Sequence, residues 1–106
     1  MIQIHFFQNP AGELLGFEIF GHSGTAEAGN DIVCAAVSSA AYMAANTVTD
    51  VLMADAEATV RDGEMSLRIG QKDAALCRSL LKGLKLHLIA LEEQYPDHIN
   101  VSYTEV

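Results

Sequence analysis

A strand, a glycine-rich loop and the start of a helix follow one another in residues 14–37, which read LLGFEIFGHSGTAEAGNDIVCAAV. Apolar side chains recur at every second position near the start of this stretch, and that period of two predicts a strand over Leu14–Phe20. Three glycines with small neighbours then interrupt the pattern, so a loop is expected to follow the strand. These glycines are Gly21, Gly24 and Gly29.

Beyond the loop the sequence predicts a long helix over Ile32–Met53. Asp31 directly precedes it and is a residue type that caps helix N-termini, with Asn30 as an alternative cap one position earlier. The first half of this helix is rich in Ala and Ser, which permit the close approach of other backbone.

The remaining elements are predicted from alternation, helical spacing and turn residues. They are a strand over Met1–Phe7, a strand over Ala56–Arg61, a tight turn at Asp62-Gly63, a strand through Met65, Leu67 and Ile69, a helix over Lys72–Tyr95 and a strand through Ile99, Val101 and Tyr103. The expected order is ββαββαβ. Two amphipathic helices on one face of a mostly antiparallel sheet make a two-layer α+β fold. Residues 1–106 are expected to form a single domain.

The chain is acidic, with 6 Lys and Arg, 14 Asp and Glu and a net charge of −8 over 106 residues. Half of its residues are hydrophobic, which argues against disorder. A nucleic-acid partner is not expected, because phosphate contacts need Lys and Arg. Residues 1–60 contain seven acidic residues and no Lys or Arg. A basic partner is therefore expected to approach this part of the chain.

Two cysteines do not make a disulfide framework. No basic segment precedes an apolar stretch, so a signal peptide is not expected. The apolar stretch Ile32–Met53 is interrupted by polar residues, so it is not expected to span a membrane. A cytoplasmic protein without a membrane partner is the resulting interpretation. The loop glycines do not match a nucleotide-binding spacing, and no cofactor is expected.

Cys34 is the first candidate for chemistry. If Asp31 is the cap, Cys34 lies in the first helical turn, where unpaired N–H groups and the helix dipole favour a thiolate. The same N–H groups are expected to stabilise an oxyanion. The alternative is that Cys34 is an ordinary small buried residue. The negative charges of Glu27 and Asp31 work against a thiolate.

His22 is the second candidate, because it stands where the strand enters the glycine loop. It is predicted to face Cys34 across the loop, take the thiol proton and later protonate the leaving amine. A surface loop histidine is the alternative. Asp31 either caps the helix or orients His22. Ser38 shares a helix face with Cys34, so it either touches substrate or eases helix packing.

Other groups have no such pattern. Cys77 falls on the leucine stripe of the second helix and is expected in the core. His5 is expected on the outward face of its strand, and no role is assigned to the two remaining histidines. His22, Asp31 and Cys34 do not suggest a metal site, because no fourth ligand has a matching spacing.

Three segments carry a family resemblance: Gly21-His22-Ser23-Gly24, the run from Gly29 to Ser38 that reads GNDIVCAAVS, and Leu91-Glu92-Glu93-Gln94-Tyr95. On these residues the chain resembles the bacterial ribosomal-processing cysteine protease family, Prp, over essentially its whole length. The resemblance implies a cysteine endopeptidase in which His22 is the base and Cys34 the nucleophile. It also implies a homodimer and a loop that closes over bound peptide.

The substrate that the resemblance implies is the N-terminal extension of the large-subunit ribosomal protein numbered twenty-seven, which ends in aromatic residues. Two alternatives do not need a protease. The first is a non-catalytic acidic assembly factor that holds a basic ribosomal protein. The second is a redox-sensing thiol at Cys34.

Overall fold

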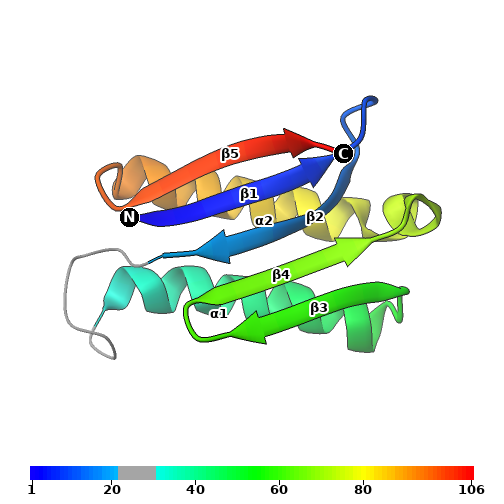
Figure 1. Cartoon of the computed structure of the whole chain (residues 1–106), viewed down its shortest axis with the longest axis horizontal. Coiled ribbons are helices and arrows are strands. Elements are labelled where there is room, and N and C mark those ends of the chain that lie inside the picture. The colour runs from blue at the N-terminus through cyan, green and yellow to red at the C-terminus, as the bar shows by residue number, and fades with distance from the viewer. Residues whose placement is uncertain (22–30) are drawn as a thin grey trace.

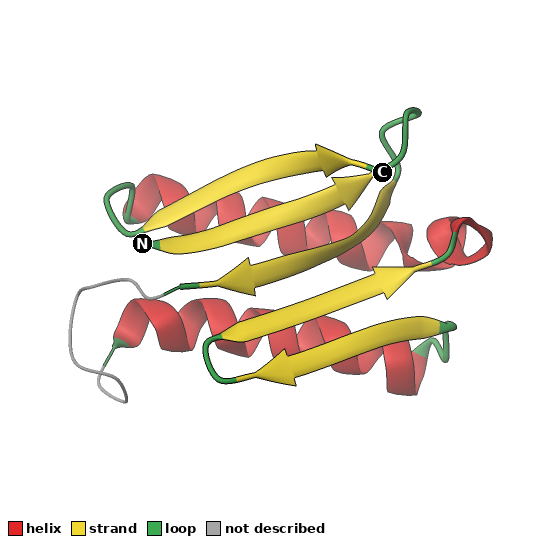
Figure 2. Cartoon of the chain, in the orientation of Figure 1, coloured by secondary structure: helices red, strands yellow, loops and turns green. Residues whose placement is uncertain are grey.

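Five strands form one sheet, and both long helices cover the same face of it (Figures 1 and 2). The computed structural model describes residues 1–21 and 31–106. The elements run in the order β1 (Ile2–Gln8), β2 (Leu14–Phe20), α1 (Ile32–Asn46), η1 (Thr47–Val51), β3 (Ala56–Arg61), β4 (Glu64–Ile69), η2 (Gln71–Asp73), α2 (Ala74–Gln94) and β5 (Ile99–Glu105). The predicted ββαββαβ order and two-layer α+β class are therefore confirmed.

The sheet order is β3-β4-β2-β1-β5. Three neighbouring pairs are antiparallel, and β1 pairs with β5 in parallel. The β1–β2 and β3–β4 hairpins are joined side by side through β2 and β4. The parallel pair brings the last strand beside the first, and the N-terminus and C-terminus lie at opposite ends of that pair (Figure 1).

Alternation along the strands separates the core from the open face of the sheet. In β1, Ile2, Ile4 and Phe6 are at most 2% exposed, while the residues between them are partly exposed. The helices supply the opposing layer of the core. Its buried helical side chains are Val33, Val37, Ala41 and Ala44 from α1 and Ala74, Cys77, Leu81, Leu84 and Leu88 from α2.

The first helix ends differently from the sequence prediction. α1 stops at Asn46 and a π-helical turn, η1, carries the chain to Val51. Thr47 and Thr49 donate their hydroxyls to backbone carbonyls one turn earlier, at 2.8 and 3.1 Å. Such back-bonding competes with regular helical hydrogen bonding and often bends helices. The sequence interpretation overlooked this effect of threonine.

The segment Ile32–Val51 has a mean hydropathy of 1.4 and, by length and composition alone, is apolar enough to cross a membrane. One helix that passes this test is weak evidence for a span, because the core helix of a soluble protein passes it too. In the fold, one side of the segment packs on the sheet through Val33, Val37 and Val48, each at most 1% exposed.

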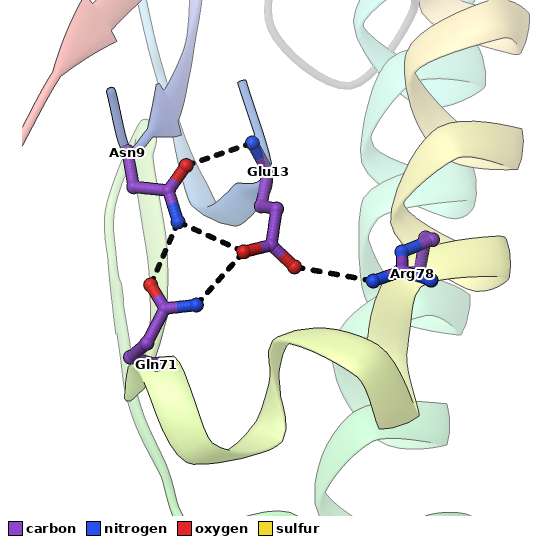
Figure 3. Close-up of polar contacts among 4 residues, drawn as sticks. All are labelled: Asn9, Glu13, Gln71 and Arg78. Carbon is purple, nitrogen blue, oxygen red and sulfur yellow. Dashed lines mark hydrogen bonds and ion pairs between the residues drawn. The ribbon is translucent and has the colours of Figure 1, made fainter. Parts of the chain in front are cut away.

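A polar cluster joins the β1–β2 turn to the start of α2 (Figure 3). Glu13 Oε1 accepts hydrogen bonds from Asn9 at 3.1 Å and from Gln71 at 2.9 Å, and Oε2 pairs with Arg78 at 3.2 Å. These three hydrogen bonds hold the pKa of Glu13 below its usual 4.5, and the one from Asn9 contributes most. The cluster lies at the opposite end of the sheet from the start of α1 (Figure 1).

Candidate active site

Asp31 caps α1 and fixes the position of Cys34. Its backbone is extended, with φ −83° and ψ 102°. Its Oδ1 accepts hydrogen bonds from the N–H groups of Val33 and Cys34, both at 3.0 Å. The carboxylate is only 8% exposed. The prediction that Asp31 is the helix cap is correct, and Cys34 lies at the third helical position as expected.

These hydrogen bonds correct the expectation for the oxyanion site. Sequence reasoning treated the N–H groups at the helix start as unpaired, but those of Val33 and Cys34 donate to Asp31. The physical reason is that a cap residue satisfies the very donors that the helix end leaves over. An oxyanion at Cys34 would therefore need other donors, or a shift of the Asp31 side chain.

Cys34 lines a cavity of about 170 Å³ between α1, the ends of β1 and β2, and the β3–β4 turn. Ser38 and Tyr42 line the same cavity one and two turns further along α1. Spacing of four residues places side chains on one helix face, which explains why the three residues meet. The structure thus brings Ser38 to the cavity of Cys34.

The opposite wall of this cavity comes from the β3–β4 turn, through Arg61, Gly63 and Glu64. Sequence reasoning missed these residues. No local signal could have found them, because their place beside Cys34 depends on β4 pairing with β2.

Gly21 lies at the end of β2 and also lines the cavity. Its φ is +90°, and a Cβ atom there would stand 2.4 Å from the carbonyl oxygen of Met1. Only glycine fits this conformation and this close approach. His22, Gly24 and Gly29 lie outside the described residues, so their predicted roles stay predictions.

Cys77 is the other cysteine, and it is fully buried in α2. Burial, with a smaller contribution from Asp73, raises the pKa of its thiol above 9.0. The prediction that Cys77 belongs to the core is confirmed, and no disulfide joins it to Cys34. This thiol is unsuited to nucleophilic chemistry near neutral pH.

His5 lies on the open face of the sheet, as predicted. Its Nδ1 is 3.0 Å from Glu18 Oε1, and its ring meets the Phe20 ring edge-on at 5.3 Å between centroids. Within residues 1–21 and 31–106, no three His, Cys, Asp or Glu side chains are grouped so that they could hold a metal ion.

The fold and the cavity that holds a helix-start cysteine are those of a small α+β cysteine protease. The chain matches the family described as "Cysteine protease Prp" over residues 1–100 and belongs to that family. It is 27% identical to the ribosomal processing cysteine protease Prp of Bacillus subtilis (strain 168) over 110 residues, and the match covers 96% of both proteins.

Solved structures share the fold. The Prp of S. aureus with a covalently linked product peptide superposes with a TM-score of 0.89 at 24% identity, covering 98% of this chain and 100% of that one. SMU.848 from Streptococcus mutans superposes with a TM-score of 0.82 at 27% identity, covering 100% of this chain and 99% of that one. A second S. aureus Prp structure holds a substrate peptide.

Proposed function

We propose that this protease removes the N-terminal extension of the large-subunit ribosomal protein numbered twenty-seven, with Cys34 as nucleophile and His22 as general base. One observation carries the proposal. Cys34, at the capped start of α1, lines a cavity in a chain of the Prp cysteine protease family. The relative from Bacillus subtilis is named a ribosomal processing cysteine protease, which supports a ribosomal protein as the substrate.

The reaction has two steps, acylation of Cys34 and hydrolysis of the resulting thioester. His22 takes the proton of the Cys34 thiol, the sulfur attacks the scissile carbonyl carbon, and the C–N bond breaks as His22 protonates the leaving amine. A water molecule then gives its proton to His22 and attacks the thioester. The C–S bond breaks, His22 returns the proton to the Cys34 sulfur, and the new carboxyl group gives its remaining proton to solvent.

The other residues support this chemistry. Asp31 fixes the start of α1, because its Oδ1 accepts hydrogen bonds from the N–H groups of Val33 and Cys34. Ser38 contacts substrate from the neighbouring turn of α1. Gly21 turns the chain at the end of β2, and Gly24 and Gly29 allow the loop to order around a peptide.

The assembly that we propose is a homodimer of a single protease domain, residues 1–106, acting in the cytoplasm, where ribosomes assemble. The net charge of −8 supports a basic protein as its partner, rather than nucleic acid or an anionic membrane surface.

Mass spectrometry of the ribosomal protein after incubation tests this function. We expect removal of the extension by the native protein and by a folded Cys77→Ala control, and no removal by Cys34→Ala or His22→Ala. Salt-sensitive binding with an unchanged substrate mass would instead support the acidic assembly factor. A mixed disulfide at Cys34 without cleavage would support the redox sensor.

A further inference from the structure

Two cavities meet at the start of β4. The cysteine cavity, of about 170 Å³, is the one lined by Cys34. A second cavity of about 290 Å³, the outer cavity, shares three lining residues with it, namely Ile19, Glu64 and Met65. A peptide substrate spans several residues, so one cavity of 170 Å³ holds only part of it, and the adjoining cavity offers room for the rest.

The outer cavity opens on the face of the sheet that no helix covers. Its lining residues Glu18, Phe20 and Ser66 alternate along β2 and β4 with side chains that face the helices. Glu64 is directly opposite Phe20, at the last residue pair between β2 and β4. It therefore stands on the rim where the two cavities join.

The charges of the two cavities differ. Among the described lining residues, the outer cavity has Glu18 and Glu64 and no Lys or Arg, whereas Arg61 lines only the cysteine cavity. Glu18 is paired with His5 at 3.0 Å. Glu64 is exposed, and within the described part of the chain no ion pair engages it, although Arg61 lies directly opposite on β3.

We propose that the substrate peptide runs from the cysteine cavity across Glu64 into the outer cavity, and that Glu64 binds a Lys or Arg side chain of the substrate there. This rests on the proposed function and adds a specificity-determining residue to it. Phe20 supplies an apolar surface for the stem of such a side chain, because long basic side chains bury their methylenes and keep the charge at a polar edge.

The test uses the Cys34→Ala protein, so that binding is measured without cleavage. Peptides that span the extension junction carry a single Lys, Gln or Glu at successive positions on either side of the scissile bond. Fluorescence anisotropy gives each Kd. We expect one position at which Lys binds roughly two- to fivefold more tightly than Gln, the range of a partly exposed ion pair.

Adding Glu64→Gln should abolish that preference, and Glu64→Lys should reverse it in favour of Glu. The matched control is Glu57→Gln, an equal change of charge at an exposed position of β3 that lines neither cavity. It should leave the Lys preference intact.

Equal Kd values for Lys and Gln peptides at every position would overturn the proposal, and so would a preference that survives Glu64→Gln or the absence of measurable binding. Failure of the proposed function looks different. In that case the native protein leaves the ribosomal protein uncut, whatever the Kd values of the peptides.

Discussion

Asp31 places a carboxylate at the backbone of the residue that is proposed to attack the substrate. It accepts hydrogen bonds from the N–H groups of Val33 and Cys34, and it is almost fully buried. The helix start and the nucleophile therefore depend on one side chain. The cost is a negative charge beside the thiol, which His22 or the bound substrate must offset.

Asp31→Ala should lower the free energy of unfolding by about 1 kcal/mol, because two helix-start donors lose their acceptor. Asp31→Asn keeps an acceptor oxygen at that place and should lower the free energy of unfolding by only a few tenths of a kcal/mol. Thermal unfolding of both variants checks this prediction. An equal loss in both variants would contradict the cap as the source of stability, and kcat/KM of the folded Asn variant reports any second role in orienting His22.

At this scale the sequence predicted what is local. The cap at Asp31, the helical position of Cys34 and the core position of Cys77 follow from residue type and spacing along one helix. The sequence interpretation did not recognise that the cap at Asp31 occupies the Cys34 N–H group, which it had also expected to stabilise an oxyanion. Arg61 and Glu64 could not be found, because they line the cavity of Cys34 only through the pairing of β4 with β2.

Among the elements, the β1–β2 turn is tied to α2 through Glu13 (Figure 3). Hydrogen bonds from Asn9, Gln71 and Arg78 keep the pKa of Glu13 lowered in the folded state. Because the pKa of Glu13 is lower in the folded chain than in the unfolded chain, the ionised carboxylate stabilises the fold at any pH above the unfolded pKa, near 4.5. This stabilisation is lost as the pH falls through the pKa of the folded state.

Glu13→Gln should therefore have a lower Tm than the native chain at pH 7, and the gap should narrow progressively below pH 4.5. Thermal unfolding measured from pH 7 to pH 3 checks this, with Glu57→Gln on the exposed β3 strand as the control. A gap that stays constant over the whole range would mean that the carboxylate charge is not what joins the turn to the helix.

Gly16 in β2 shows how closely two elements approach each other. Its φ is +143°, and a Cβ atom there would stand 2.0 Å from the carbonyl oxygen of Leu67 in β4. Gly16→Ala should lower the free energy of unfolding by at least about 2 kcal/mol, because the backbone of β2 or β4 must move to make room for the methyl group. Gly83→Ala is the matched control, because that position of α2 is open, and there alanine should add about 0.5–1 kcal/mol. Equal effects in a denaturant titration would contradict the close approach.

The periodicity of apolar residues and the turn residues predicted which helices and strands form, but not where every helix ends. The strand Leu14–Phe20 and the turn at Asp62-Gly63 are where the pattern placed them. The end of α1 is not, because the hydroxyls of Thr47 and Thr49 bond to the preceding turn and the helix widens.

For the whole molecule, strand order decides where the site lies. The sequence predicted five strands and two helices in the right order, but neither the β2–β4 pairing nor the parallel β1–β5 pair, since long-range pairing leaves no local pattern. The β2–β4 pairing brings the β3–β4 turn to Cys34 and builds the wall of the cysteine cavity.

The net charge of −8 also acts at this scale. Electrostatic attraction between exposed charges weakens as the Debye length falls from about 10 Å at 0.1 M salt to about 3 Å at 1 M. Binding of the basic ribosomal protein to the Cys34→Ala variant should weaken at least about threefold between these conditions. An affinity that is independent of salt would contradict a role for the acidic surface, and an uncharged peptide serves as the control.

The central claim is that Cys34 is the nucleophile. The direct measurement is the rate at which Cys34→Ala cleaves a peptide that spans the extension junction, followed by mass spectrometry, with thermal unfolding to show that the variant is folded. We expect the rate to fall at least about a thousandfold, as when a catalytic nucleophile is removed. Cleavage by folded Cys34→Ala at close to the native rate would contradict the account.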